Sequence, residues 1–237
     1  MTFEKKIYYI ALTNEGYIEY TNNLLESIKA NGCDIQLNIY AIDKKSYDYF
    51  KTKTNTIYLE TNTEVINNFT SQTDNQFGYL MVSKFAAIHN ALLNEEMVVY
   101  IDGDIVIKKN FENLLLNNMD NRDIIFQNDK RPSKPNELKL CAGFMCIRSN
   151  KKTLKFFEPT EKLLNKFLKY KTHDQTHINK NKSKFKYGVL SLKDFPNGPY
   201  FYENYGTFEP YIIHFNFLIG EIKKQKMIDY GEWYLEK

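Results

Sequence analysis

Segments with two different patterns of apolar residues follow one another along the chain. Continuous or alternating apolar runs of strand length lie at residues 7–12, 34–43, 55–60, 97–101, 122–129, 139–150, 187–192 and 210–218. Apolar residues recur at helical spacing in residues 17–32, 79–94 and 152–170, while residues 173–181 fit a short helix or a loop. The first pattern predicts strands and the second predicts helices with one apolar face.

The order of these elements predicts the class of fold. Strands that alternate with helices favour a mainly parallel sheet covered by helices on both faces. No repeat or linker interrupts the chain, so we expect one α/β domain over residues 1–237. Residues 61–75 are polar and predict a loop, and the stretch 61–78 is a candidate lid over a bound ligand.

Composition narrows the class of protein further. The 237 residues are 43% hydrophobic and carry a net charge of +3, which is ordinary for a folded protein. The densest basic stretch, residues 180–186, is short, which argues against a nucleic-acid partner. Three cysteines without a CxxC pair disfavour a disulfide scaffold or a structural zinc site. With no membrane-length apolar run and no signal peptide before the first strand, we expect a soluble cytoplasmic protein.

The stretch "YIDGDIVI" places two carboxylates where a buried strand should end. Asp102 and Asp104 flank Gly103, with apolar runs on both sides. Ligands of parallel α/β sheets bind beyond the carboxyl ends of strands, and a glycine lets a ligand approach the backbone. Neighbouring carboxylates repel unless a cation joins them, and their oxygens suit Mg²⁺ or Mn²⁺. A solvated D-G turn is the alternative, but the flanking apolar runs favour a metal site.

A second candidate element is "YIIHFNFLIGEIKK" near the end of the chain. His214 ends an apolar run, and a neutral imidazole is a suitable third ligand for Mn²⁺. Gly220 permits close approach to phosphate oxygens, which Lys223 or Lys224 can neutralise. A hydrogen-bonded histidine at a strand end explains His214 equally well, so both interpretations stay open on the residues alone.

Five segments over residues 78–227 form a set of motifs in a fixed order: "SKFAAIHNALL", "YIDGDIVIKKNFENLL", "CAGFMCIRSN", "HDQTHIN" and "HFNFLIGEIKKQKM". The set resembles retaining glycosyltransferases of the GT-A fold, in particular the nucleotide-diphospho-sugar transferase family, a relative of the glycogenin and galactosyltransferase family. One departure is the wide gap between His214 and Gly220, because galactosyltransferase-type members place the glycine closer. The H-x-N form fits the nucleotide-diphospho-sugar transferases better.

The resemblance implies a glycosyltransferase that moves a sugar from a nucleotide-sugar donor, most often a UDP-sugar, to a glycan or protein acceptor with Mn²⁺. The implied metal ligands are Asp102, Asp104 and His214. The implied donor contacts are Thr13, Asn14, Asp43, Lys84, Asp102, Gly103, Asn216, Gly220 and Lys223. Thr13 or Asn14 as a helix cap, and Asp43 as a plain turn residue, are the structural alternatives.

The same resemblance assigns the reacting end of the donor to the segment "HDQTHIN". Asp174 would bind hydroxyls of the donor sugar, and Gln175 would lie near the anomeric carbon. The family reaction retains configuration. Because an amide is a poor nucleophile, Gln175 suits a same-face route in which the leaving phosphate deprotonates the acceptor hydroxyl.

Two other functions compete with this one. Asp102-Gly-Asp104-Ile-Val106 also matches the first motif of haloacid-dehalogenase-type phosphohydrolases, with Asp102 as nucleophile. That motif usually opens its domain, whereas here it lies well inside the chain, and no later strand ends in the acidic pair that such enzymes need. A protein that binds a nucleotide sugar without turning it over is the third interpretation, against which the presence of Asp104, His214 and Lys223 speaks.

Overall fold

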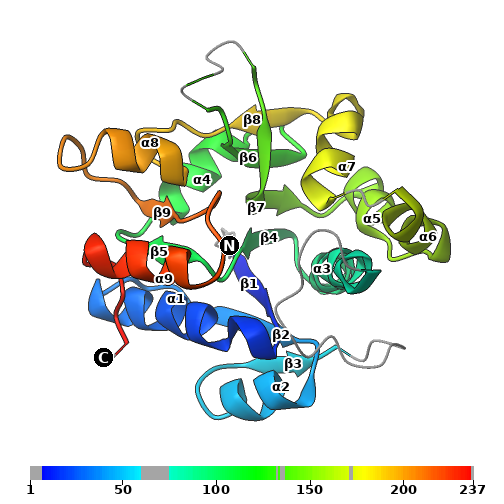
Figure 1. Cartoon of the computed structure of the whole chain (residues 1–237). Helices are drawn as coiled ribbons and strands as arrows, with labels where there is room; N and C mark the ends of the chain where they lie inside the picture. Colours follow the sequence, from blue (N-terminus) through cyan, green and yellow to red (C-terminus); the bar gives the residue numbers. More distant parts are fainter. Residues whose placement is uncertain (1–6, 60–74, 132, 134–136, 171–172, 236–237) are drawn as a thin grey trace, which may run out of the picture.

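The central element of the computed structural model is a seven-stranded mixed sheet (Figure 1). The structure describes residues 7–59, 75–131, 133, 137–170 and 173–235. In spatial order β3-β2-β1-β4-β7-β6-β8, the strands are Thr56–Tyr58, Leu37–Ala41, Tyr8–Thr13, Met97–Ile101, Leu140–Arg148, Ile124–Asn128 and Tyr187–Val189. Only β7 among these strands runs antiparallel to its neighbours, so the predicted mainly parallel sheet is confirmed.

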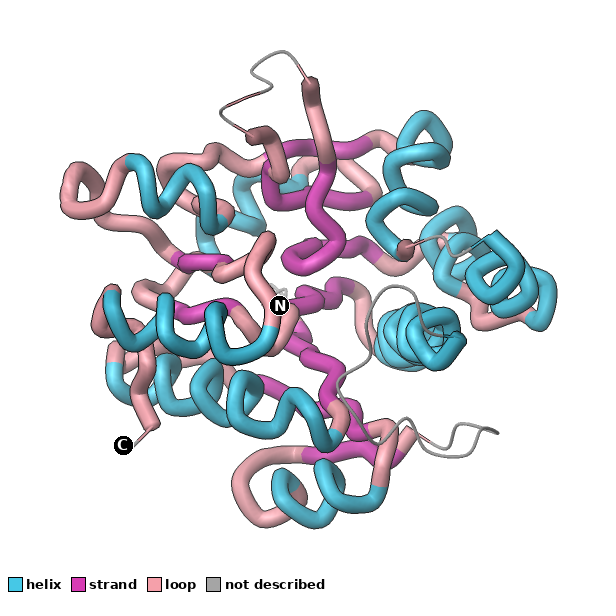
Figure 2. Tube along the Cα trace, viewed as in Figure 1, coloured by secondary structure: helices cyan, strands magenta, loops and turns pink. Residues whose placement is uncertain are grey.

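Helices cover both faces of this sheet, as its apolar strands require (Figure 2). On one face lie α1 (Ile18–Ala30) and α4 (Glu112–Met119), and on the other α3 (Asn75–Asn94), α5 (Lys151–Phe157), α6 (Glu161–Tyr170) and α7 (Asp174–Asn181). The remaining helices are α2 (Lys44–Phe50), α8 (Gly198–Glu203) and α9 (Gly220–Asp229), with short 3-10 turns at Glu15–Tyr17 and Lys182–Lys184.

Strand β4 shows why the sequence builds this arrangement. Met97, Val99 and Ile101 pack into the core beneath α1 and α4. Val98 and Tyr100 point the other way, into the core beneath α3. Because successive side chains of a strand face opposite sides of the sheet, a strand with helices on both sides must be apolar throughout. The continuous apolar run before Asp102 is the consequence.

A second, two-stranded sheet is the part of the fold that the site depends on. Strand β5 (Ile105–Ile107) directly follows the acidic turn and pairs antiparallel with β9 (Ile212–His214). In this register Ile105 lies opposite His214. The pairing therefore carries a residue from the end of the chain to the turn at Gly103.

Some elements differ from their predictions. Helices α2, α4, α8 and α9 were not predicted, because their apolar stripes are short. Segment 195–211 is rich in aromatic residues. It packs: Phe195 and Phe201 are buried, and the ring of Phe195 stacks on Tyr211 at 5.7 Å. Most of the candidate lid, residues 61–74, lies outside the described residues, and α3 begins at Asn75.

No helix in the described part of the chain is both long enough and apolar enough to cross a lipid bilayer.

Candidate active site

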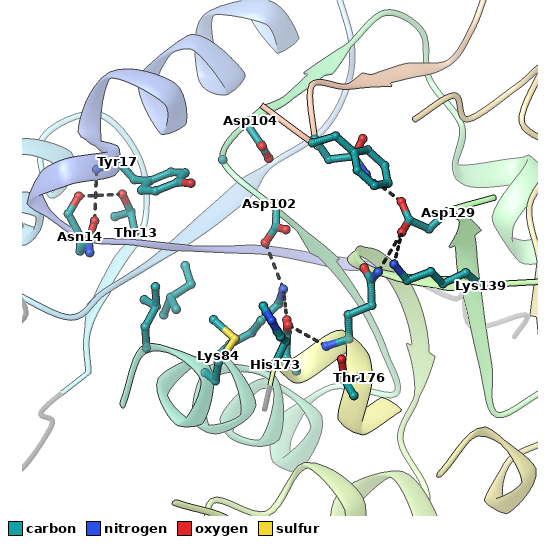
Figure 3. Close-up of a pocket in the computed structure, with 18 of the residues that line it drawn as sticks. Thr13, Asn14, Tyr17, Lys84, Asp102, Asp104, Asp129, Lys139, His173 and Thr176 are labelled. Carbon is teal, nitrogen blue, oxygen red and sulfur yellow. Dashed lines mark hydrogen bonds and ion pairs between the residues drawn. The ribbon is translucent and has the colours of Figure 1, made fainter. Parts of the chain in front are cut away.

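A cleft opens at the sheet edge where β1 and β4 end. Its volume is about 530 Å³, within the usual range for a small-molecule site. Figure 3 shows side chains from both faces of the sheet pointing into it. The residues that line it are Leu12, Thr13, Asn14, Tyr17, Leu80, Met81, Lys84, Asp102, Gly103, Asp104, Asp129, Arg131, Lys139, His173, Asp174, Gln175, Thr176, Asn216 and Phe217.

The acidic turn is shaped by a close approach of helix α1. Between β4 and β5 the chain turns sharply, and the Ile105 backbone N–H donates to the Asp102 carbonyl at 3.1 Å. A Cβ at Gly103 would lie 2.7 Å from Thr21 Oγ1. Only glycine therefore fits between the turn and α1, which adds packing to the ligand-approach reason predicted for Gly103.

Two carboxylates and an imidazole converge at the floor of the cleft. Ligand atoms of Asp102, Asp104 and His214 all lie within 4.8 Å of one another, and His214 Nε2 is 3.2 Å from Asp104 Oδ1. The space between these side chains and Gly143 is free only because residue 143 has no Cβ. A Cβ at Gly143 would lie 2.6 Å from Asp102 Oδ2 and closer still to His214 Cε1. The donor set and this free space fit a divalent cation such as Mn²⁺ or Mg²⁺.

The charge of Asp104 is balanced by two buried cations. Lys223 Nζ contacts Asp104 Oδ2, and both side chains are almost fully buried. Burial alone would raise the pKa of Asp104, but the positive charges of Lys223 and His214 outweigh it and hold that pKa below its usual range. In the same way burial would lower the pKa of His214, yet the carboxylate of Asp104 raises it well above its usual value. Asp104 is thus a carboxylate at neutral pH, as a metal ligand must be.

Lys84 joins the acidic turn to helix α7. Its Nζ lies 3.1 Å from Asp102 Oδ1 and 2.7 Å from Asp174 Oδ2. Burial would lower the pKa of Lys84, but Asp102 and Asp174 raise it well above its usual value, so the side chain is a fixed cation. Tyr100 Oη also donates to Asp102 Oδ1, at 2.8 Å. The two predicted donor residues Lys84 and Asp174 are therefore one ion-paired unit with Asp102.

The amide of Gln175 is held in one orientation at the start of α7. Its Oε1 accepts from the Ala142 backbone N–H at 3.2 Å, and its Nε2 donates to Asp129 Oδ2 at 2.8 Å. The other oxygen of Asp129 accepts from Asn216 Nδ2 at 2.9 Å. Asp129 thus links two predicted site residues that lie far apart in sequence.

The predicted nucleotide residues separate into two groups. Thr13 and Asn14 line the cleft at the end of β1, and Asn14 Oδ1 also accepts from the Tyr17 backbone N–H at 3.1 Å. Asp43 does not line the cleft. It is fully buried, and its carboxylate caps α2 by accepting from the Ser46 backbone N–H. It also accepts from the Glu15 backbone N–H at 2.7 Å, so it stabilises the turn that carries Asn14 and Tyr17.

The segment from His214 to Lys223 lies partly beneath the residues that line the cleft. His214 and Lys223 are buried beneath the lining residues and reach it through Asp104. Gly220 has a positive φ of 54° at the start of α9, and its carbonyl accepts from Tyr20 Oη at 2.9 Å. A left-handed conformation favours glycine, which gives Gly220 a structural reason beside the predicted phosphate contact.

Sequence reasoning missed several lining residues: Tyr17, Asp129, Arg131, Lys139, His173, Thr176 and Phe217. A signal for Asp129 existed, because it directly follows strand β6, just as Asp102 follows β4. The carboxyl-end rule that selected Asp102 applies to both strands. Phe217 carries no such signal; it has a positive φ of 65°, and the Arg131 guanidinium lies 4.4 Å from its ring centroid.

Known proteins share both the sequence pattern and the fold. The profile of the family described as nucleotide-diphospho-sugar transferase matches residues 36–228. A UDP-galactose:fucoside alpha-3-galactosyltransferase of Dictyostelium discoideum is 27% identical over 98% of this chain, which spans 45% of that relative's length. Galactosyltransferase LgtC, solved with donor and acceptor sugar analogues, superposes with a TM-score of 0.58 at 9% identity over 98% of both chains. The glycosyltransferase GlyE of Streptococcus pneumoniae gives 0.60 at 14% identity, over 98% of this chain and 61% of its own.

The mixed sheet with its acidic turn has the GT-A fold seen in the glycosyltransferase LgtC. The chain belongs to the nucleotide-diphospho-sugar transferase family, whose profile covers most of its length. The family and fold predicted from the five segments are both confirmed. They replace the haloacid dehalogenase alternative, in which Asp102 was the nucleophile.

Proposed function

We propose that this chain transfers a sugar from a UDP-sugar to a hydroxyl of a glycan or protein acceptor, with retention of configuration and with Mn²⁺ as cofactor. The observation that carries the proposal is the convergence of Asp102, Asp104 and His214 at the floor of a cleft of nucleotide-sugar size. UDP as the nucleotide is supported by the name of the Dictyostelium relative, whose donor is UDP-galactose.

Asp102, Asp104 and His214 would hold the metal ion, which when bound neutralises charge on the departing diphosphate. Lys84 lies beside Asp102 as a buried, permanently charged group. A preorganised cation of this kind stabilises negative charge that grows as the anomeric C–O bond breaks. Lys223 would act similarly from the other side of Asp104.

Asp174 and Gln175 would orient the donor sugar. Both begin helix α7, and each is held by a partner across the cleft: Asp174 by Lys84 and Gln175 by Asp129. Held side chains position a substrate without further loss of freedom. The amide of Gln175 supplies no nucleophile, which supports the same-face route for retention.

A binding protein without turnover is the second candidate, and activity separates the two. We would measure UDP release from a panel of UDP-sugars with Mn²⁺ and with a chelator. The proposal expects turnover that needs Mn²⁺ and that falls about 10²- to 10³-fold in Asp104→Asn. The asparagine keeps the shape of the side chain and an oxygen for Lys223.

Asp123→Asn is the matched control, because Asp123 is also a buried, hydrogen-bonded carboxylate but precedes β6 at the opposite edge of the sheet. It should keep the wild-type rate. Tight UDP binding with no release of UDP from any donor sugar would favour the binding protein instead, and unchanged turnover in folded Asp104→Asn would refute the metal site.

A further inference from the structure

The proposed chemistry leaves Gln127 without a role, although both ends of its buried amide are hydrogen-bonded beside the site. Gln127 lies on β6 and is fully buried, and its amide bonds to His214, Phe195 and Pro196, which do not line the cleft. Its Oε1 is 2.7 Å from His214 Nδ1. Its Nε2 donates to the carbonyls of Phe195 at 3.2 Å and Pro196 at 2.9 Å.

These contacts leave the Gln127 amide one orientation. If the amide were turned over, its oxygen would face two carbonyl oxygens that have nothing to donate, and its NH₂ would face the imidazole. Because buried polar groups keep their partners, the oxygen must face His214. An amide oxygen only accepts, so Nδ1 of His214 must carry a proton and donate it to Gln127.

The consequence is a choice between the two nitrogens of His214. With Nδ1 keeping its proton for Gln127, Nε2 is the nitrogen that can release a proton and offer its lone pair to a metal, and Nε2 lies 3.2 Å from Asp104 Oδ1. Cys141 Sγ is also near Nδ1, at 3.6 Å, but it is a weak partner and already accepts from the Gly143 backbone N–H at 3.4 Å.

The local backbone explains how β6 delivers this side chain. Pairing of β6 with β7 jumps from Phe126 opposite Met145 to Gln127 opposite Cys141, so β7 bulges between Cys141 and Met145. Gly143, which makes room beside His214 and Asp102, lies inside this bulge. Bulges re-aim side chains and are common next to active sites.

We propose that Gln127 is a positioning residue that fixes the proton of His214 on Nδ1 and thereby presents Nε2 to the cation. The inference rests on the metal site of the proposed function and adds a residue that does not itself touch the cation or the donor. A hydrogen bond from the far nitrogen both orients a histidine ligand and raises its basicity.

The test compares three variants by Mn²⁺ affinity, measured from the free-ion electron paramagnetic resonance signal with Mn²⁺ alone and with Mn²⁺ and UDP. Gln127→Met removes the acceptor and should weaken Mn²⁺ binding about 10- to 100-fold. Gln127→Glu loses the donors to Phe195 and Pro196 but keeps an acceptor for Nδ1, so it should stay much closer to the wild type. Cys141→Ala, which removes the other neighbour of Nδ1, should bind like the wild type.

A merely structural role predicts a different pattern, because Gln127→Met and Gln127→Glu both lose the hydrogen bonds to the carbonyls of Phe195 and Pro196. Equal loss of Mn²⁺ affinity in both folded variants, or wild-type affinity in Gln127→Met, overturns the inference while the metal site stands. If the wild type itself retains no Mn²⁺ with UDP, the proposed function and this inference fail together. As a second readout, the Nδ1 proton of His214 in the Mg²⁺-UDP complex should exchange slowly in the wild type and faster in Gln127→Met.

Discussion

At the scale of single residues, the site depends on glycines as much as on charged groups. Gly143 has no side chain to bind a ligand, yet any Cβ at this position would collide with Asp102 and His214. Gly103 plays the same part between the acidic turn and helix α1. Because a protein interior is closely packed, an added methyl group there forces neighbouring side chains or the backbone to shift.

We therefore expect Gly143→Ala to abolish metal binding while leaving the fold intact. The added methyl group would push the imidazole and the Asp102 carboxylate apart, with a stability cost of about 1–3 kcal/mol, as overpacking usually brings. Mn²⁺ titration and urea unfolding measure the two effects. Gly188→Ala is the matched control, since its Cβ would meet the flexible Arg122 side chain at 2.7 Å; wild-type Mn²⁺ affinity in Gly143→Ala would contradict the expectation.

At the scale of elements, helix α7 combines two tasks. Its first residues face the cleft, and its second turn buries His177 against α3, α5 and α6. The imidazole stacks on Phe156 with ring centroids 5.2 Å apart, and Lys166 Nζ donates to its Nδ1 at 3.0 Å. The layer of helices therefore fixes the helix that carries Asp174 and Gln175.

This packing predicts a pH dependence of stability. Burial first, and then the charges of Lys166 and Lys184, lower the pKa of His177 to about 4, against about 6.5 in the unfolded chain. Between these values the unfolded state binds more protons, so this contribution is complete above about pH 6.5 and is lost as the pH falls toward 4. Urea unfolding should show the wild type losing about 2 kcal/mol more than His177→Gln between pH 7 and pH 5. Equal losses would mean that His177 is protonated in the folded protein.

At the scale of the whole molecule, the cleft draws its lining from segments spread over almost the entire chain, from Leu12 to Phe217. A ligand that joins them stabilises the native state, because the unfolded chain has no such site. The lining comes from β1, helices α3 and α7 and the loops that follow several strands, so the gain should appear in global unfolding.

We expect UDP with Mn²⁺ to raise the melting temperature by roughly 5–10 °C at a hundredfold excess over the dissociation constant, which corresponds to about 2.7 kcal/mol. Thermal unfolding with each UDP-sugar in turn would rank the donors. Asp104→Asn should lose the part of the shift that depends on Mn²⁺. A shift of the same size in that variant would argue that the nucleotide binds without the metal.

Local patterns carried most of the fold and part of the site. The strands and the long helices followed from the spacing of apolar residues, since β4 is apolar on both faces and α3 carries one stripe. The acidic turn stood out because Asp102 and Asp104 interrupt buried strands within three residues. The short helices α4 and α8 left too little periodicity to find.

Tertiary contacts settled what no local pattern encodes. Pairing of β5 with β9 brings His214 within 3.2 Å of Asp104, a contact between two residues far apart in the sequence that no local pattern could predict. Asp129 and Gln127 reach the site through the carboxyl end of β6 and the bulge opposite it. A strand's own residues dictate that it is buried, because burial depends on which side chains it carries; they do not dictate its neighbour, because pairing depends on every other strand that competes for the same edge.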